Sequence, residues 1–177
     1  MRELPLGEVL DKLIDHRGRT PKKLGGDFVA KGVPVVSALL VKNGRLRLSE
    51  ARRISQNMYE KWMPVPTVRH DVVLTSEAPL GNCALIESDD PVALGQRVFG
   101  LRGLSEVLDG RFLFYALQTD RVQNQLHGRS SGTTVLGIRR AELVKVMVPV
   151  PEMSDQQAIV DVLGALDDKI VVNERIV

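Results

Sequence analysis

The organisation of this chain follows from its residues 148–177, VPVPEMSDQQAIVDVLGALDDKIVVNERIV. Pro149 and Pro151 end the preceding element, because proline has no backbone N–H to donate. Ser154 then stands where a helix N-cap is expected, and Gln157 follows three residues later in the capping-box pattern. The segment therefore predicts a helix that begins at Ser154 and runs to the last residue, over roughly 36 Å at a rise of about 1.5 Å per residue.

Apolar residues recur along this predicted helix at alternating spacings of four and three, which is a heptad pattern. The pattern, which we call the helix seam, consists of Ile159, Leu163, Leu166, Ile170, Asn173 and Val177. A polar residue such as Asn173 within a seam often fixes the register or the number of paired helices. Two interpretations follow. Either the seam contacts another helix in a coiled-coil-like arrangement, or the helix packs on its own domain.

The composition is that of one globular domain with an appendage: 177 residues, 44% hydrophobic and 26% charged. Aromatic residues make up only 4%, which argues against a surface that stacks single-stranded bases. Because Cys83 is the one cysteine, no disulfide framework is expected, and a reducing, cytoplasmic location fits. We also expect no membrane association, because no apolar run reaches about 18 residues and the first residues lack a signal-peptide core.

Charge divides the chain into the same two parts that the pattern predicts, a body at 1–150 and a helix at 151–177. The body holds 22 Lys and Arg against 16 Asp and Glu, and the helix segment holds 2 against 6. The local net charges are therefore +6 and −4, although the whole chain carries only +2. A basic body suggests a polyanionic partner and an acidic helix a different one. Chance scatter over a solvated surface is the alternative.

Upstream of the helix, the pattern predicts an α+β body with a mixed sheet and short helices. Strands are expected at 33–41, 45–48, 72–75, 83–86, 92–101 and 145–150. Helical segments are expected at 6–14, 55–62 and 111–126, the last with a break near residue 119, and a helical turn at 139–144. Asn43-Gly44 is a strong hairpin signal, and Ser55 and Asp109 are expected helix N-caps.

One pattern is typical of hydrolases, Gly128-Arg129-Ser130-Ser131-Gly132, which matches G-x-S-x-G. That motif requires a strand before the serine and a helix after it. Here a helical pattern precedes the serine and a β-branched pair follows it. The sequence therefore favours a flexible polar loop, with a hydrolase that uses Ser130 as an alternative.

Patterns that would bind a metal or a cofactor are weak. His16, His70 and His127 are far apart in sequence, and Cys83 has no second cysteine. Asp167-Asp168-Lys169 has the carboxylate–x–Lys spacing of metal-dependent nucleases, but a solvated helix face explains it better. Glycine-rich phosphate loops and dinucleotide fingerprints do not occur. We therefore expect no metal, no cofactor and no catalytic residue, and a binding module rather than an enzyme.

Residues 17–31, RGRTPKKLGGDFVAK, form a basic segment with the glycine and proline content of a loop. Mobile cations in such a loop suit phosphate contact, because they displace condensed counterions from DNA. A solvated connector is the alternative. The candidate phosphate contacts are Arg17, Arg19, Lys22, Lys23 and, beside the hairpin, Lys42.

Four segments together resemble the specificity subunit of type I DNA restriction-modification systems. They are RGRTP at 17–21, GVPVVSALLVKNG at 32–44, SGTTVLGI at 131–138, and a P-x-P-x-x-x-x-Q-x-x-I entry into a helix, here Pro149, Pro151, Gln156 or Gln157, Ile159 and Leu163. Their order and spacing extend over nearly the whole chain. The chain departs from the family pattern in its single recognition unit, its short helix, and His70, where a Gly often stands.

The resemblance implies a non-catalytic DNA target recognition domain at 1–150 and the start of a conserved spacer or dimerisation helix at 151–177. Such a subunit reads one half of a bipartite site in the major groove of double-stranded DNA. It docks methyltransferase (modification) subunits and often ATP-dependent restriction/translocation subunits. The single unit implies either a piece of a two-domain subunit or a half-subunit that forms a homodimer through its helix. A scaffold without a nucleic-acid role is the remaining alternative.

Base reading requires side chains with paired hydrogen-bond donors or acceptors. The candidates on this criterion are Asn43 at the hairpin, Thr75, Ser76 and Asn82 in one loop, and Arg129, Ser130, Ser131, Thr133 and Thr134 in another. Arg129 suits guanine, whereas Asn43 or Asn82 suits adenine. For any single Ser or Thr, turn or cap chemistry is the competing interpretation.

Overall fold

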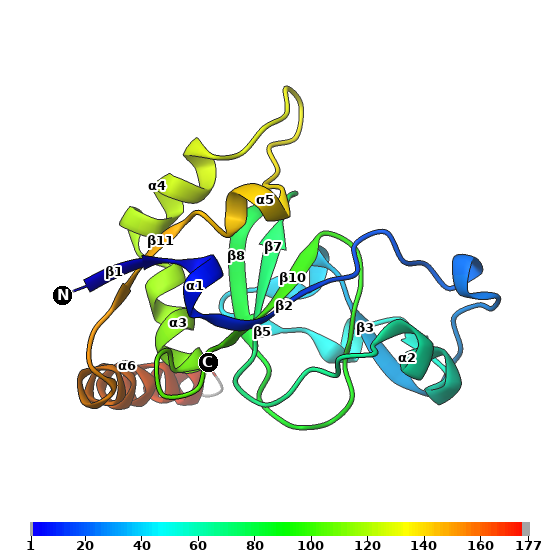
Figure 1. Cartoon of the computed structure of the whole chain (residues 1–177). Coiled ribbons are helices and arrows are strands. Elements are labelled where there is room, and N and C mark those ends of the chain that lie inside the picture. The colour runs from blue at the N-terminus through cyan, green and yellow to red at the C-terminus, as the bar shows by residue number, and fades with distance from the viewer. Residues whose placement is uncertain (1, 175–177) are drawn as a thin grey trace.

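The computed structural model describes residues 2–174 and confirms the mixed α+β class (Figure 1). Its strands are β1 (Arg2–Pro5), β2 (Leu10–Asp15), β3 (Val33–Val36), β4 (Val41–Lys42), β5 (Arg45–Leu46), β6 (Arg53–Ile54), β7 (Val72–Ser76), β8 (Leu80–Leu85), β9 (Ala93–Leu94), β10 (Val98–Gly103) and β11 (Met147–Val150). Its helices are α1 (Leu6–Val9), α2 (Gln56–Trp62), α3 (Gly110–Leu117), α4 (Asp120–Gly128), α5 (Arg140–Leu143) and α6 (Met153–Glu174), with short 3-10 helices η1 (Lys22–Leu24), η2 (Ala38–Leu40) and η3 (Leu48–Glu50).

A four-stranded antiparallel sheet in the order β2-β10-β7-β8 forms the centre of the molecule. Side chains alternate across it, so that Val72 and Leu74 of β7 join one core cluster and Val73 joins the other. The first cluster contains residues of α3 and α4, such as Leu117 and Leu126, which pack against the sheet. The sheet is therefore buried on both faces, which explains its nearly continuous apolar strands.

The other face is covered by a smaller sheet in the order β6-β3-β9 and by α2, on the right of Figure 1. β3 pairs antiparallel with β6 and parallel with β9, so this sheet is mixed as predicted. Trp62 at the end of α2 is buried, and its Nε1 donates a hydrogen bond of 2.9 Å to the Leu94 carbonyl. α2 is thereby fixed to β9.

Local signals in the sequence are confirmed where one turn or cap decides the structure. Asn43 and Gly44 have φ values of 51° and 75° and join β4 to β5. The Ser55 hydroxyl accepts a hydrogen bond from the Met58 N–H at the start of α2. The Asp109 carboxylate accepts from the Arg111 N–H at the start of α3, and the predicted break separates α3 from α4.

Two predictions about helix boundaries are wrong. The predicted helix at 6–14 is a single turn, α1, followed by β2, because β2 completes the central sheet by pairing with β10. The predicted N-cap Ser154 lies inside the first turn of α6, which begins at Met153, and the Glu152 carbonyl accepts from the Asp155 N–H. In the first case a tertiary strand pairing outweighs a local pattern.

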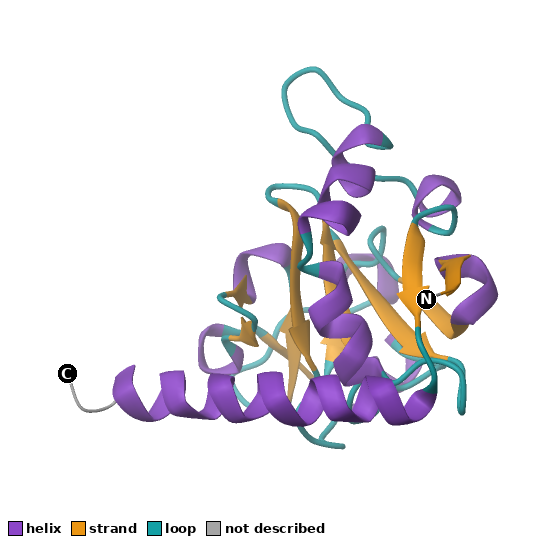
Figure 2. Cartoon of the chain, turned by 90° about the vertical axis from the view of Figure 1, so that its left-hand side faces the viewer, coloured by secondary structure: helices purple, strands orange, loops and turns teal. Residues whose placement is uncertain are grey.

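α6 lies along the base of the body and rests on α3 (Figure 2). Gln156 is fully buried, and its side chain accepts from the Asp109 N–H at 2.9 Å and donates to the Val107 and Pro151 carbonyls at 2.8 and 2.9 Å. About three turns further along, the Tyr115 hydroxyl donates to the Asp167 carboxylate at 2.7 Å. Polar contacts therefore fasten the helix to the body from its first turn to Asp167.

The helix seam lies mostly outside the contact between α6 and the body. Ile159, Leu166 and Ile170 are 39, 50 and 55% exposed, whereas Val160, which lies off the seam, is buried. Leu163 is half-buried and Asn173 is exposed, while Val177 lies outside the described residues. The helix thus packs on its own domain through one face and leaves a second, apolar face uncovered.

Candidate nucleic-acid interface

Four segments converge at one end of the central sheet and surround a cavity of about 600 Å³. They are the chain after β2, the β7–β8 turn, the β9–β10 turn and the loop between α4 and α5. The lining residues are Asp15, Arg17, Gly18, Ser76, Glu77, Gln96, Arg97, Ser131, Gly137, Ile138 and Arg139. Three of the segments follow or join sheet strands, and the fourth, the loop between α4 and α5, is tied to β7 by the Ile138 N–H, which donates to the Ser76 carbonyl. We call this the open end of the sheet.

The loop at 129–139, which we call the reading loop, projects from the open end (top of Figures 1 and 2). Ser131 and Gly137 close its base by exchanging two backbone hydrogen bonds of 2.9 and 3.0 Å. The Ile138 N–H donates to the Ser76 carbonyl at 2.9 Å, which ties the loop to β7. Gly132 has a φ of 126°, and a Cβ there would lie 2.1 Å from the Val135 carbonyl oxygen. The tip therefore has a definite shape that only glycine at 132 permits.

Arg17 braces this loop from the strand side. Its guanidinium donates two hydrogen bonds to Asp15, of 2.8 and 2.9 Å, and a third of 3.3 Å to the Ile138 carbonyl. Its Cζ also lies 4.0 Å from the centre of the Phe99 ring, in cation–π geometry. Burial alone would raise the pKa of Asp15, but hydrogen bonds and charge from Arg17 outweigh it and hold that pKa below its usual value. The structure therefore gives Arg17 a positioning contact in addition to any phosphate contact.

The cations of the molecule concentrate in one segment, whose loop at 17–31 lies beside the open end, whereas its Lys42, Arg45 and Arg47 line a separate cavity with α6. Residues 17–63 hold 11 Lys and Arg against 3 Asp and Glu, a net charge of +8 in a chain whose total is +2. Among the predicted phosphate contacts, Lys22, Lys23 and Lys42 are exposed. Lys23 Nζ donates to the Gly18 carbonyl at 2.9 Å, and Arg19 donates to the backbone carbonyls of α2. These bonds fold the basic loop against α2 with its charges outward.

A second cavity, of about 540 Å³, lies next to the first within this basic region. Arg19, Lys22, Leu39 and Trp62 contribute to its lining, and Gln96 lines both cavities. On its wall the Arg52 guanidinium lies 3.5 Å from the centre of the Phe28 ring. A continuous surface therefore runs from the reading loop across the β9–β10 turn to the basic loop.

The predicted base-reading residues divide by exposure. Thr75 and Ser76 are buried, and within the described residues the Thr75 hydroxyl has no hydrogen-bond partner. Neither side chain is presented to a duplex in this conformation. Asn82 is exposed and donates to the Val41 carbonyl at 3.3 Å, which holds the β4–β5 hairpin, and Asn43 is exposed at that hairpin.

The base-reading candidates of the reading loop are exposed or half-buried at the surface. Thr133 and Thr134 are exposed at the tip, and Ser131 is exposed at its base. The Ser130 hydroxyl donates to the His127 carbonyl at 2.7 Å, which is turn chemistry. Arg129 is half-buried and lies 3.5 Å from the Glu142 carboxylate, an ion pair at the solvent boundary. This loop follows a helix rather than a strand, so the strand–turn–helix geometry required for a Ser130 nucleophile is not present.

Comparison with known proteins shows the family of the chain. A family model described as "Type I restriction modification DNA specificity domain" matches residues 1–176. The chain belongs to this family. It is 25% identical over 154 residues to the type I restriction enzyme MjaVIII specificity subunit of Methanocaldococcus jannaschii, a match over 84% of this chain and 36% of that protein. A putative type I restriction enzyme MjaX specificity subunit of the same organism is 24% identical over 105 residues, which cover 59% of this chain and 24% of that one.

Solved structures share the fold of this specificity domain. The type I restriction-modification S subunit from M. genitalium superposes with a TM-score of 0.64 at 22% identity, over 94% of this chain and 39% of that one. The HsdS subunit from Thermoanaerobacter tengcongensis gives 0.66 at 21%, over 98% and 39%. The chain thus spans well under half the length of the specificity subunits that it matches.

Reasoning from the sequence missed three residues at the open end of this specificity domain. Gln96, Arg97 and Arg139 line the first cavity and are exposed, yet the first two were hidden inside a predicted strand at 92–101. Gly95 was the available signal, because a glycine inside an apolar strand pattern often marks a bend or a close backbone approach.

Three further features concern a reactive thiol, a metal site and a membrane-spanning helix in the described part of this specificity domain. Burial raises the pKa of the Cys83 thiol to about 12, so this cysteine is a poor nucleophile. Among residues 2–174, His, Cys, Asp and Glu side chains do not gather in threes where a metal ion would be held. Nor is any described helix both long and apolar enough to cross a membrane.

Proposed function

We propose that this chain reads one half of a bipartite DNA site for a type I restriction-modification complex in the cytoplasm. In this proposal residues 1–150 are the target recognition domain and 151–177 belong to a spacer helix. The family match supports it, and the observation that carries it is the exposed, backbone-fixed reading loop beside a segment of net charge +8. The chain is a non-catalytic component that directs the enzyme subunits.

Positioning on DNA and reading of bases fall to different residues. Phosphate contact falls to the exposed Lys22 and Lys23 of the basic loop, with Arg19 beside them. Lys42 is a candidate contact outside this surface, because its hairpin lines a cavity with α6. Base reading falls to Thr133 and Thr134 at the tip of the reading loop, with Arg129 at its start. Because Ser131 and Gly137 already fix the base of the loop, binding in a major groove should cost little conformational entropy.

Methyltransferase subunits, and with them restriction/translocation subunits, are the proposed protein partners of α6. Figures 1 and 2 both place α6 and the reading loop at opposite ends of the body, so a partner on the helix leaves the open end free for DNA. The uncovered helix seam provides an apolar surface for a second helix, in a homodimer or in a longer subunit.

Methylation-site mapping tests the function directly. The chain is expressed together with its cognate methyltransferase subunit, and modified positions are read across a genome. The proposal expects methylation at a defined bipartite sequence, and it fails if methylation is absent or follows no sequence. A duplex-binding assay at several salt concentrations then separates a DNA reader from a scaffold, because a scaffold binds no duplex at any salt concentration.

The phosphate set is tested by replacing Lys22 and Lys23 with Ala together. Because each neutralised phosphate contributes about 0.9 to the slope of log K against log salt, the slope should fall by about 1.8. Affinity should fall for cognate and random duplexes alike, with the preferred sequence unchanged. Lys145, an exposed lysine that pairs with Glu142, provides the control substitution. An unchanged slope removes both lysines from the set.

The helix seam is tested by Leu166→Asp, which places a charge at a half-exposed seam position. Sedimentation of the parent chain should show a concentration-dependent dimer, and the variant should sediment as a monomer. Val172→Asp is the control, because Val172 is similarly exposed but lies off the seam. A parent that stays monomeric at high concentration excludes the homodimer.

A further inference from the structure

We propose that the turn Gln96–Arg97, between β9 and β10, is a second base-reading element beside the reading loop. The inference rests on the proposed DNA-reading function and adds two residues to it. Both side chains are exposed at the open end, and both contribute to the first cavity. Gln96 also lines the second cavity, so this turn lies between the reading loop and the basic loop.

The backbone of the turn is fixed from both sides. The Gly95 N–H donates to the Val36 carbonyl at 2.7 Å, and the Gln96 carbonyl accepts from the Ala38 N–H at 3.2 Å. On the other side the Arg97 carbonyl accepts from the Ser76 N–H at 2.8 Å. A Cβ at residue 95 would lie 2.8 Å from a Val35 methyl carbon, so the chain approaches β3 as closely as a glycine allows. The exposed side chains thus project from a turn whose backbone is hydrogen-bonded on both sides.

Arg97 itself has a φ of 64°, in the left-handed region that favours glycine. An L-residue in this region carries strain, and such strain often accompanies a functional role for the side chain. A glycine would satisfy the same turn without strain. The left-handed backbone at Arg97, together with the exposure of its side chain, therefore supports a role for the guanidinium.

The chemistry of the two side chains suits base edges in the major groove. Arginine forms a bidentate pair with guanine, and glutamine forms one with adenine. The Arg97 Nε lies 3.2 Å from the Glu77 carboxylate, and Glu77 also forms a backbone bridge with Gly137 at the base of the reading loop. The ion pair holds the guanidinium beside that loop, so the two elements face the same stretch of DNA.

Two substitutions of Arg97 separate base reading from charge and from folding. Arg97→Gly relieves the φ strain, so its melting temperature should equal or exceed that of the parent. Arg97→Lys keeps the positive charge but removes the planar fork. With the cognate methyltransferase subunit, both variants should lose the preference at one base position, which a bidentate pair sets at about 5- to 150-fold. Gln96→Ala should relax a neighbouring position.

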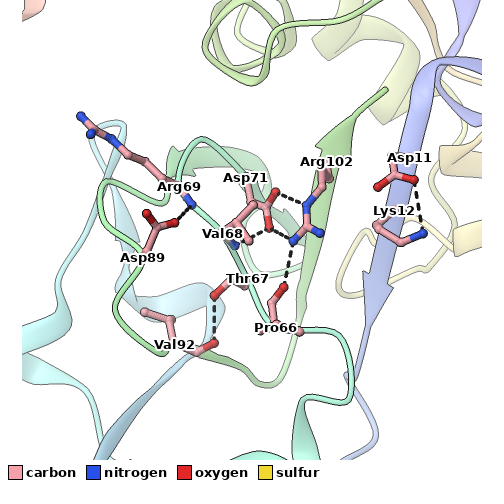
Figure 3. Close-up of polar contacts among 10 residues, drawn as sticks. All are labelled: Asp11, Lys12, Pro66, Thr67, Val68, Arg69, Asp71, Asp89, Val92 and Arg102. Carbon is pink, nitrogen blue, oxygen red and sulfur yellow. Dashed lines mark hydrogen bonds and ion pairs between the residues drawn. The ribbon is translucent and has the colours of Figure 1, made fainter. Parts of the chain in front are cut away.

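Arg69→Ala is the matched control, because Arg69 is an exposed arginine just before β7 begins, at the end of the sheet away from Arg97, and its side chain is directed away from the Asp71–Arg102 pair (Figure 3). It should leave every base preference intact. If Arg97→Lys retains the full preference, or if Arg97→Gly weakens all sequences equally with a salt slope lower by about 0.9, Arg97 is a phosphate contact and the inference is wrong. A parent chain that directs no sequence-specific methylation overturns the proposed function instead.

Discussion

The two ends of the central sheet use their charged residues in opposite ways. At the end where β7 begins, the buried Asp71 carboxylate accepts two hydrogen bonds of 2.8 Å from Arg102 and one of 3.0 Å from the Val68 N–H (Figure 3). Arg102 also donates to the Pro66 carbonyl. The hydrogen bonds to Asp71 raise the pKa of the Arg102 guanidinium above its usual value. We call this the closed end. At the open end, Arg97 and Arg139 reach solvent.

The closed end also holds α6. Gln156 bonds to backbone groups in the chain that follows β10, and α3 begins there as well. The buried ion pair and the attachment of α6 thus lie at one end of the strands. The exposed hydrogen-bond donors of Arg97 and Arg139 lie at the other. The sheet thus separates the two tasks, so substitutions at the closed end should change the free energy of unfolding and those at the open end should change DNA selectivity.

The largest effect on stability is expected from Arg102→Met. The substitution leaves the Asp71 carboxylate buried without its cation, which should reduce the free energy of unfolding by about 3 kcal/mol. Urea denaturation measures the loss. A double variant, Arg102→Met with Asp71→Asn, should recover part of it because the buried charge is gone. Methylation-site preference should stay that of the parent, and a change in preference would break the division between the two ends.

A smaller effect is expected from Gln156→Ala, which removes the side chain that joins α6 to the closed end. Three backbone groups lose their partner, so the free energy of unfolding should fall by about 2 kcal/mol. Gln157→Ala provides the matched control, because this neighbouring glutamine is exposed and donates to Asp161 within α6. Equal losses for the two variants would show that the buried network does not hold the helix.

These two glutamines illustrate what sequence reasoning could predict. The Q-x-x-I entry pattern was visible, but the choice between Gln156 and Gln157 depends on the chain after β10, about 50 residues away in sequence. Signals confined to a few residues, such as Asn43-Gly44, Ser55 and Asp109, correctly predicted a hairpin and two helix starts. The helix predicted at 6–14 was wrong because its apolar spacing also suits a strand that pairs with β10.

The candidate site shows the same limit. The reading loop was predicted from its small polar residues, yet its brace joins Arg17 to Ile138 across 121 positions. Gln96 and Arg97 stayed hidden because residues 92–101 resemble one apolar strand, and the interruption depends on hydrogen bonds to β3 and β7. Burial of Thr75 likewise follows from pairing with Val98, which no local pattern shows.

The smallest effect on stability, and the sharpest test of the open end, is expected from Arg17→Met. Loss of the partly exposed Asp15 pair should cost about 1 kcal/mol at neutral pH. Because Arg17 holds the Asp15 pKa below its usual value, this contribution exists above about pH 4, the ordinary carboxyl pKa, and disappears as pH falls through the lowered one. Parent and variant should therefore converge in stability in acid.

DNA binding by the same variant decides what Arg17 does at the open end. If it positions the reading loop through Ile138, Arg17→Met should narrow the gap between cognate and random duplexes while the salt slope stays that of the parent. If it contacts phosphate, the slope should fall by about 0.9 and both affinities should fall together. Arg17→Lys sharpens the choice, because lysine keeps the charge but lacks the guanidinium fork that spans Asp15 and Ile138. A lysine variant with full selectivity would contradict the positioning role.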